Sequence, residues 1–311
     1  MSEEIQQNAV IGTRGSDLAL VQAAATERAL TLAFPDLRLQ RSVIRTTGDR
    51  RTDVALKDVA KAEGTDKGIF TKELEEALRT QTIDIAVHSL KDVPTVLEDD
   101  FEIAGVLNRA PIRDVLVTRS SGGLDRLPAG AVVGTSAVRR AKQLQWLRPD
   151  LKVVDLRGNV PTRLRKLAEG SSDAILLAEA GLVRLGYRMN QPSLVAGALL
   201  HFTPLPEDFF YPAAGQGAIG FEIRKGDQAA AALVAGIRDE ATFTRIRAER
   251  EFLRLLEGGC STPVGVYSRL ESGTLHMAAR VFPEAGGNPR SAEASGTDPL
   301  QVALQLFESL A

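Results

Sequence analysis

The sequence predicts an α/β protein of several domains, and three observations support this class. Segments typical of strands alternate with segments typical of helices over the first two thirds of the 311-residue chain, which favours largely parallel sheets. A strand-to-helix pattern occurs twice, so two similar domains are expected. The last third combines one long helix with alternating segments, which indicates a separate, smaller α+β domain.

Eight strands are expected first, because short runs rich in Val, Ile and Leu lie between turn-forming residues. They span residues 9–12, 39–45, 83–88, 101–107, 114–118, 131–134, 152–156 and 173–177. Leu, Ala or Val recur at spacings of three and four at residues 18–32, 71–79, 138–147 and 162–167, which predicts helices. A long helix after Gly236 precedes two alternating segments, 264–267 and 276–281, which predict antiparallel strands.

The internal repeat joins a strand to the start of a helix. Residues 9–13 are Ala-Val-Ile-Gly-Thr, residues 131–135 are Ala-Val-Val-Gly-Thr, and a Pro-Asp-Leu triplet follows each helix. Any two strand-helix units share some likeness, but the shared order of both elements favours a duplication. Unpaired N–H groups and the helix dipole attract anions at such helix starts. Two facing copies would form an anion-binding cleft.

Composition indicates an ordinary soluble chain. It is 44% apolar and 25% charged with a net charge of -2, and it lacks the basic excess that a nucleic-acid surface needs. No apolar run approaches the roughly 20 residues of a membrane span, and the polar first residues do not resemble a secretory signal. A cytoplasmic protein without nucleic-acid or membrane partners is therefore expected.

The single cysteine, Cys260, suggests an attachment point. Lone cysteines are often inert, buried apolar residues. A packing role would place the cysteine inside a periodic segment, whereas Gly258 and Gly259 before it and Pro263 after it shape an approachable turn. One cysteine also permits no internal disulfide.

Arginines follow several predicted strand ends, where α/β sheets bind ligands. A surface arginine often serves only solubility, but the guanidinium fork suits carboxylates and phosphates. Arg157 has a stronger case, since Gly158 and Asn159 turn the chain sharply at a strand end. The candidates for anion binding are Arg14, Arg139, Arg140, Arg157, Arg163 and Arg184. A ligand with several carboxylates would use all of them.

The segment after the strand at residues 83–88 supplies the expected chemistry. It carries Ser89, Lys91 and Asp92 to the carboxyl end of that strand, and Pro94 stops regular structure. Asp92 and Lys91 could form only a solvated turn pair. In a cleft, however, a carboxylate about 4 Å from a developing cation gains up to roughly 4 kcal/mol at an effective dielectric near 20. Asp92 is therefore the candidate for stabilising a positively charged intermediate.

Other motifs are weak. His88, His201 and His276 show no zinc-ligand spacing with Cys260, so no metal site is expected. Residues 215–220 fit the pattern G-x-G-x-x-G, but an apolar segment follows where a dinucleotide site requires a helix. These glycines favour close backbone approach, between domains or to a ligand.

Eight motifs together resemble the porphobilinogen deaminase family, also called the hydroxymethylbilane synthases. They occur in the family's order over about residues 8–270, and their joint occurrence makes the resemblance specific. They are Gly-Thr-Arg-Gly-Ser at 12–16, Ala-Val-His-Ser-Leu-Lys-Asp-Val-Pro at 86–94, Val-Gly-Thr-Ser at 133–136, Arg-Arg at 139–140, Leu-Arg-Gly-Asn-Val at 156–160, Thr-Arg-Leu at 162–164, Ala-Gly-Gln-Gly-Ala at 214–218 and Glu-Gly-Gly-Cys at 257–260.

The resemblance implies a monomeric transferase of tetrapyrrole biosynthesis, the route to haem and chlorophyll. Such an enzyme deaminates four porphobilinogen molecules, joins them head to tail and releases linear hydroxymethylbilane by hydrolysis. It also implies two type II periplasmic-binding-protein-like domains, each with a parallel-rich sheet, at residues 1–107 with 213–236 and at residues 112–208. A small α+β domain at residues 238–311 would carry the cofactor cysteine.

The same resemblance implies roles for individual residues. A dipyrromethane cofactor, built from two porphobilinogen units, would be bound through a thioether to Cys260 and serve as the primer. Asp92 would stabilise cationic pyrrole species and help move protons, and the six arginines would hold acetate and propionate groups. The other binding residues would be Ser16, Lys67, Phe70, Ser89, Lys91, Thr135, Ser136, Gln216 and Gly217.

Three departures from the family pattern stand out. Ala137 replaces a serine that many members have, residues 60–66 are longer and more acidic than a glycine-rich lid, and Asp17 is unusual beside Ser16 although it suits a helix start.

Two other functions stay open on the residues alone. A cytoplasmic solute sensor would bind a small anion reversibly, with Cys260 purely structural and without a covalent adduct. A cysteine-dependent hydrolase would need a base near the thiol, and no histidine is paired with Cys260 in the sequence.

Overall fold

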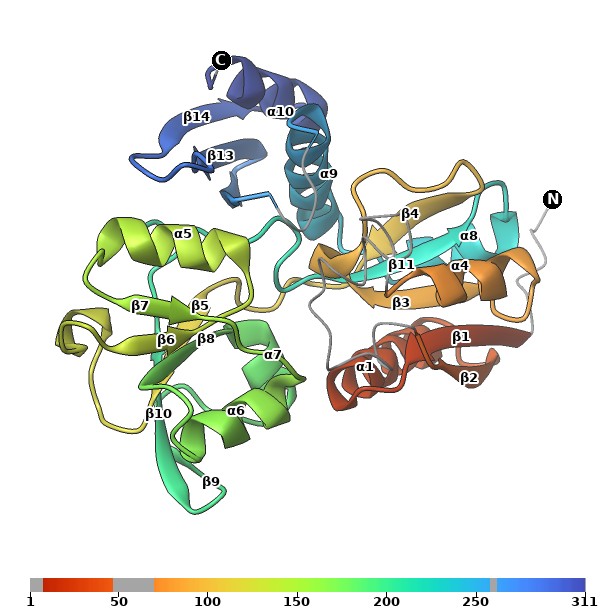
Figure 1. Ribbon diagram of the computed structural model, residues 1–311. Coiled ribbons are helices and arrows are strands. Elements are labelled where there is room, and N and C mark those ends of the chain that lie inside the picture. The colour runs from red at the N-terminus through yellow and green to blue at the C-terminus, as the bar shows by residue number, and fades with distance from the viewer. Residues whose placement is uncertain (1–7, 47–69, 258–261, 311) are drawn as a thin grey trace. The chain divides into compact units, whose positions relative to one another are not determined.

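The computed structural model describes residues 8–46, 70–257 and 262–310 (Figure 1). Contacts divide the chain into two compact units, residues 1–109 with 218–244 and residues 110–217 with 245–311. The predicted site residues Lys67 and Cys260, and the segment 60–66, lie outside the described residues. All other predicted site residues are described.

The first unit contains one sheet, which has five strands among its described residues. In order along the sheet these are β2 (Arg38–Ile44), β1 (Asn8–Arg14), β3 (Ile85–Ser89), β11 (Ile219–Arg224) and β4 (Phe101–Val106). β1 is parallel to β2 and β3, whereas β11 is antiparallel to β3 and β4. Figure 1 shows β11 between β3 and β4 although it lies far away in the sequence.

Helices cover both faces of this sheet. Leu30 of α1 (Asp17–Ala33) and Leu233 of α8 (Gln228–Ala235) share a buried core with Val87. Leu74 and Leu78 of α4 (Lys72–Arg79) pack with Ala86, the preceding residue of the same strand. Since successive side chains of a strand point to opposite faces, α4 lies on the face opposite to α1 and α8.

The second unit contains a six-stranded sheet within its described part. Its strands, in order, are β7 (Lys152–Val154), β6 (Val132–Gly134), β8 (Ala174–Ala178), β5 (Asp114–Thr118), β10 (Ala198–Pro204) and β9 (Ser193–Val195). Helix α5 (Val138–Leu147) covers one face, and α6 (Val160–Ala168) and α7 (Glu179–Arg184) cover the other. β6 is parallel to β7 and β8, and β5 is antiparallel to β8 and β10.

Both sheets follow one topology. β2-β1-β3-β11-β4 corresponds strand for strand to β7-β6-β8-β5-β10. In each sheet the antiparallel strand is the first one after the chain crosses from the other unit. The chain crosses into the second unit at residue 110 and then forms β5, and it returns to the first unit at residue 218 and then forms β11. This is the type II periplasmic-binding-protein topology, so the predicted fold class is confirmed. The corresponding positions of β1 and β6 also agree with the internal repeat.

A third, smaller sheet belongs to the C-terminal part of the second unit. β12 (Val264–Glu271), β13 (Thr274–Val281) and β14 (Arg290–Gly296) form an antiparallel meander. Positive φ angles at Ser272 and Gly273 make the tight turn between β12 and β13. Phe252 of α9 (Glu240–Leu255) and Leu306 of α10 (Pro299–Glu308) pack in one core with this sheet.

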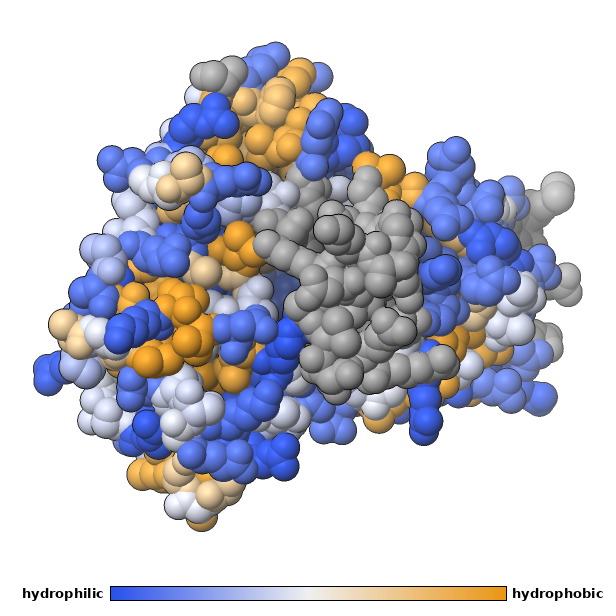
Figure 2. All heavy atoms as spheres, in the orientation of Figure 1, coloured by the Kyte–Doolittle hydropathy of each residue, from blue (hydrophilic) through white to orange (hydrophobic). Residues whose placement is uncertain are grey.

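The outer face of α10 is partly apolar. Figure 2 shows apolar surface over this helix, where Leu300 and Leu304 are exposed. Among the helices that the structure describes, none combines the length and apolar character needed to cross a bilayer.

Side-chain caps explain where several helices begin. Ser16 accepts a hydrogen bond from the backbone N–H of Ala19 at the start of α1, and Asn159 caps α6 in the same way. Asp227 caps α8 and Asp298 caps α10. Such caps satisfy N–H groups that the helix itself leaves unpaired.

The eight predicted strands and four predicted helices of the first two thirds are all present, with ends that coincide or differ by one or two residues. The prediction missed β9, β10, β11, α7, α8, β14 and α10. Helix α7 has six residues and β14 consists mainly of small and polar residues, so both carry little hydrophobic periodicity.

Asp114, the first residue of β5, is a buried carboxylate that accepts hydrogen bonds from several parts of the second unit. It is 0% exposed. Its Oδ2 accepts a hydrogen bond from Arg139 Nη1 at 2.6 Å, and its Oδ1 accepts from Arg140 Nε at 2.9 Å and Nη2 at 2.7 Å. Gln216 Nε2 also donates to Oδ1 at 3.1 Å. One carboxylate thus joins β5, α5 and the segment that leads back to the first unit.

The charge state of Asp114 follows from this setting. Burial by itself raises the pKa of the carboxyl, but the charges and hydrogen bonds of Arg139 and Arg140 outweigh it and hold the pKa well below its usual range. Asp114 is therefore ionised in the folded protein.

Replacing Asp114 by Asn should destabilise the protein by about 3 kcal/mol or more near pH 7, because two buried guanidinium groups lose their counter-charge. The pairing contributes stability above the unfolded pKa of about 3.9 and loses it as pH falls toward the lower folded pKa. The difference between wild type and variant should therefore shrink below about pH 4.

Urea unfolding at pH 7 and at pH 3 measures this difference. Asp36→Asn, in an exposed turn, is the matched control and should change stability little at either pH. Equal stability of wild type and Asp114→Asn at pH 7 would contradict the role of the carboxylate.

Candidate functional site

The segment that carries Asp92 is a single turn of 3-10 helix, η1 (Leu90–Asp92), directly after β3. The backbone N–H of Leu90 donates to the carbonyl of Ala218 at 3.1 Å, and Val93 N–H donates to Leu90 at 3.1 Å. Lys91 and Asp92 are half-buried. Within the described residues the Asp92 carboxylate makes no hydrogen bond or ion pair. Its oxygen atoms are available to a ligand.

Other predicted residues lie at the same carboxyl edge of the first sheet. Ser89 ends β3, and its hydroxyl exchanges hydrogen bonds with the side-chain amide of Gln22 on α1 at 2.8 and 3.0 Å. Arg14 ends the neighbouring parallel strand β1, and its guanidinium lies over the ring of Phe70 at 4.1 Å from the centroid. Ser16 follows as the cap of α1. The first sheet thus gathers a hydroxyl, a guanidinium and a carboxylate at one edge.

The equivalent edge of the second sheet presents Thr135 and Ser136 after β6. Thr135 Oγ1 accepts from the N–H of Ala137 at 3.2 Å, and Ser136 Oγ donates to the carbonyl of Leu156 at 2.6 Å. Ala137 is the N-cap of α5 and has no side-chain oxygen, so the first N–H groups of this helix have no capping side-chain acceptor among the described residues. This helix start therefore favours an anion.

Arg157 and Arg163 flank the sharp turn between β7 and α6. Arg157 Nε donates to Asp155 Oδ2 at 3.0 Å, and Arg163 Nε donates to the carbonyl of Gly158 at 2.7 Å. Gly158 has a φ of +113°, a conformation that glycine adopts without strain. The turn therefore places one guanidinium group against the side chain of Asp155 and the other against the backbone at this strand end.

Arg184 and Gly217 contact each other. Arg184 Nη2 donates to the Gly217 carbonyl at 2.7 Å, and burial lowers the pKa of Arg184 to about 10. No carboxylate contacts this guanidinium among the described residues. Gly217 has a φ of +85°, and a Cβ there would lie 2.5 Å from the carbonyl oxygen of Ala110. Gly217 therefore serves close backbone approach within the second unit, whereas the sequence interpretation placed such an approach between domains or against a ligand.

The two adjacent arginines of α5 differ in how many of their guanidinium nitrogen atoms make hydrogen bonds. Arg140 uses all three nitrogen atoms, since Nη1 donates to the carbonyl of Leu176 at 3.0 Å and the other two donate to Asp114. Arg139 uses only Nη1, which donates to Asp114 and to the carbonyl of Tyr211. Its Nε and Nη2 have no partner in the part of the chain that the structure describes. Arg139 can therefore bind a ligand, whereas Arg140 braces Asp114.

These contacts form one chain of residues with an excess of positive charge. Arg139 and Arg140 share the single negative charge of Asp114, Gln216 links Asp114 to Gly217, and Gly217 accepts from Arg184. Buried cations without a counter-charge are costly unless an anion binds. The structure thus brings five predicted site residues together, namely Arg139, Arg140, Arg184, Gln216 and Gly217.

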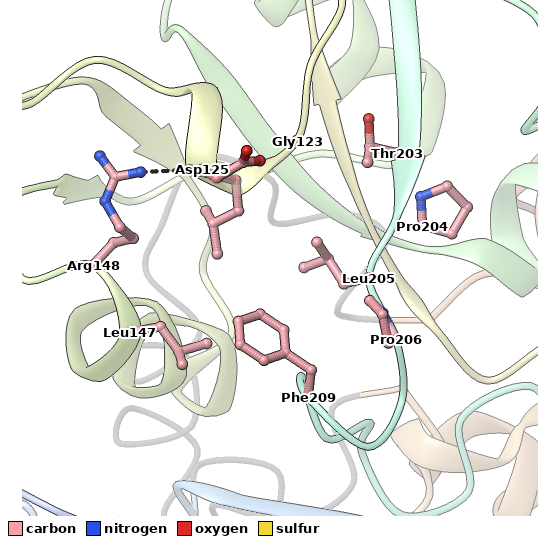
Figure 3. A pocket seen from close by; sticks show the side chains of 10 residues that line it. Gly123, Asp125, Leu147, Arg148, Thr203, Pro204, Leu205, Pro206 and Phe209 are labelled. Carbon is pink, nitrogen blue, oxygen red and sulfur yellow. Dashed lines mark hydrogen bonds between the residues drawn. The ribbon is translucent and has the colours of Figure 1, made fainter.

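A separate pocket in the second unit does not belong to this site. Its cavity of about 340 Å³ is lined by apolar side chains, including Leu147 and Phe209, and by Arg148 beside η2 (Leu124–Arg126) (Figure 3). Arg148 donates from every guanidinium nitrogen to Asp150 or to the carbonyl groups of residues 124 and 127. None of the described site residues lines this pocket, and its arginine is already satisfied.

Sequence reasoning missed Asp114 and Gln22. Both are polar residues inside apolar periodic segments, and such positions are rarely buried without a specific partner. That pattern singles them out, although the partners themselves are far away in the sequence.

Comparison with known proteins adds independent findings. The family model described as porphobilinogen deaminase, dipyromethane cofactor binding domain, matches residues 9–232. The model of the porphobilinogen deaminase C-terminal domain matches residues 243–311.

Two curated relatives are porphobilinogen deaminases. The protein from Syntrophobacter fumaroxidans is 44% identical over 96% of this chain and 94% of its own length. The protein from Roseiflexus is also 44% identical, over 98% of this chain and 96% of its own length. Among solved structures, the Bordetella pertussis BvgS VFT2 domain has 17% identity and a TM-score of 0.45, over 75% of this chain and 87% of that chain. The chain belongs to the porphobilinogen deaminase family, the transferases that make hydroxymethylbilane from porphobilinogen with a dipyrromethane cofactor in tetrapyrrole biosynthesis.

Proposed function

We propose that this transferase attaches its dipyrromethane through a thioether at Cys260, binds the acidic side chains of the pyrroles with its arginines and uses Asp92 as the catalytic carboxylate. The observation that carries this proposal is the excess of guanidinium charge among the residues linked through Asp114, of which Arg139 and Arg140 are buried and Arg184 is half-buried. A group with several acetate and propionate carboxylates supplies the missing negative charge.

The donors that remain open fit such a group. Arg139 keeps Nε and Nη2 without a partner among the described residues, α5 begins without a side-chain cap, and no carboxylate contacts Arg184 in that part of the chain. Each charge-assisted hydrogen bond contributes about 1.5 to 3 kcal/mol. When bound, the dipyrromethane supplies the terminal pyrrole carbon that is extended.

Asp92 provides the opposite charge. Its half-buried carboxylate accepts hydrogen bonds from pyrrole N–H groups and stabilises the positive charge that develops when an amine leaves. A charge 4 Å away at an effective dielectric near 20 is worth about 4 kcal/mol. That energy corresponds to roughly a thousandfold in rate. Asp92 also lies within one turn of Lys91, which offers a cation to a neighbouring carboxylate.

The remaining predicted residues complete the proposal. Arg14, Arg157 and Arg163 bind further carboxylates, and Ser16, Ser89, Thr135 and Ser136 add neutral donors. Phe70 packs beside Arg14, and Lys67 adds a further cation. Porphobilinogen is the substrate of this enzyme family, and we assign the same substrate to this chain, as a cytoplasmic monomer. The three proposed domains are residues 1–107 with 213–236, residues 112–208 and residues 238–311.

The thioether at Cys260 is tested by mass. Wild-type protein purified from cells that make porphobilinogen should show, under denaturing conditions, the mass of the bare chain plus one dipyrromethane. Cys260→Ser should show only its bare mass, because a hydroxyl cannot form the thioether. An adduct that persists on Cys260→Ser would mean that the anchor is elsewhere, and a bare wild-type chain would favour a reversible solute-binding protein instead.

The charge of Asp92 is tested by Asp92→Asn. The variant keeps the shape of the side chain but removes its charge, so kcat should fall about a thousandfold. The melting temperature and the cofactor mass should stay unchanged. Asp99→Asn, an exposed aspartate nearby in the sequence, is the control and should retain turnover. Near-normal kcat in Asp92→Asn would eliminate the catalytic role.

The role of Arg184 is tested by Arg184→Met. Methionine fills much of the same volume but removes the donor to a ligand carboxylate, so kcat/KM should fall about 10- to 100-fold. Arg119→Met is the control. Arg119 also donates to backbone carbonyl groups, at 2.6 and 2.8 Å, but it follows the carboxyl end of β5, whereas Asp114 lies at the start of that strand. Equal losses in both variants would indicate that Arg184 acts only on the fold.

A further inference from the structure

A buried pair of titratable side chains lies beside the Asp92 turn and takes no part in the chemistry above. His88 on β3 is 5% exposed, and Glu222 on β11 is 0% exposed. His88 Nε2 lies 2.9 Å from Glu222 Oε2. The two strands are adjacent and antiparallel (Figure 1). The pair therefore ties β3 to β11 four residues before Asp92.

A second carboxylate approaches the same pair from α4. Glu75 is buried, and burial, followed by the negative charge of Glu222, raises the pKa of Glu75. Glu222 Oε1 is buried and has no hydrogen-bond partner among the described residues. The imidazole of His88 is the hydrogen-bond partner of Glu222 beside this second buried carboxyl group.

β11 also supports the Asp92 turn directly. Leu90 is 1% exposed and packs over Gly220, where a Cβ would lie 2.6 Å from Leu90 Cδ1. The N–H of Leu90 donates to Ala218, the residue that precedes β11. Leu90 and His88 are two residues apart, as are Gly220 and Glu222. The same face of β11 therefore receives both side chains.

We propose that His88 and Glu222 are positioning residues for Asp92: their contact fixes the end of β3 on β11 and thereby sets where the turn Leu90–Asp92 presents its carboxylate. The inference rests on the proposed catalytic role of Asp92. Apolar residues could fill the same volume without desolvating a charge. A hydrogen-bonded polar pair at this position instead sets the register and distance of two strands through one directional contact.

The experiment compares three variants: His88→Leu, His88→Gln and the double variant His88→Leu/Glu222→Leu. His88→Leu should lower kcat about 30- to 100-fold with KM changed less than about threefold, because a misplaced carboxylate costs rate more than binding. His88→Gln keeps an N–H donor for Glu222 and should recover most of the lost kcat.

The double variant separates positioning from packing. It removes the unpaired carboxylate, so its melting temperature should return toward that of wild type, while kcat stays low. Recovery of kcat together with melting temperature would overturn the proposal, since packing alone would then suffice. Failure of His88→Gln to recover kcat would overturn it as well.

Hydrogen exchange supplies a readout that does not depend on turnover. The Leu90 amide, which donates to Ala218, should exchange at least about tenfold faster in His88→Leu than in wild type. Amides in the centre of β1 should keep their protection. Ile223→Ala, a change in a buried residue of β11, is the control and should lower the melting temperature without selective loss of protection at Leu90. Uniform loss of protection in His88→Leu would contradict a local positioning role.

The two hypotheses fail in different ways. Near-normal kcat in Asp92→Asn removes the catalytic assignment, whatever the His88 variants do. Inactive Asp92→Asn combined with normal kcat in the double variant removes only the positioning role.

Discussion

The buried carboxylate of Asp114 is the constraint on which the second unit depends. Removing a charge from water costs several kcal/mol, and only well-placed donors recover that cost. Arg139 and Arg140 supply charge, and Gln216 supplies a further hydrogen bond. Because these donors come from α5 and from the segment before β11, satisfying Asp114 also fixes the orientation of α5 and the position of Gln216 within the second unit.

The same network carries more positive than negative charge. The donors that would stabilise the free protein if they were paired internally are the same donors that the proposed acidic ligand would use. A second buried carboxylate near Arg139 would neutralise the site and strengthen the free protein, but it would also occupy the donors that an acidic ligand needs. Ala137 has a similar effect, since a side-chain cap would compete for the first N–H groups of α5. In the proposed function these groups, which have no side-chain partner among the described residues, gain their interaction energy only when the acidic ligand binds.

Local patterns in the sequence predicted the helices and strands, but they did not predict that Arg139 and Arg140 make different contacts. Strands such as β5 and β8 are apolar runs, and α1 has a cap and an acidic first turn, so both kinds of element follow from short-range rules. Arg139 and Arg140 look equivalent in sequence. On a helix, however, neighbouring residues point about 100° apart, and the partner that distinguishes them, Asp114, lies 25 and 26 residues away. Gln216 meets the same carboxylate across 102 residues. Strand β11 was missed for a related reason, because its place between β3 and β4 is decided by tertiary pairing.

The two faces of β3 explain why alternate residues from Ala86 to Asp92 have different contacts. Val87 and Ser89 point toward α1, where Ser89 meets Gln22, whereas Ala86 and His88 point toward the face covered by α4. His88 contacts Glu222 and Leu90 packs over Gly220, so alternate residues anchor the segment to β11. The polar residues between and after these anchors, Ser89, Lys91 and Asp92, are the ones to which the proposed function assigns ligand contacts. A strand end that is anchored on one face and held by α1 on the other has little freedom. The role proposed for the Asp92 carboxylate needs that restriction, because the stabilisation of a cation by a carboxylate falls with every increase in the distance between them.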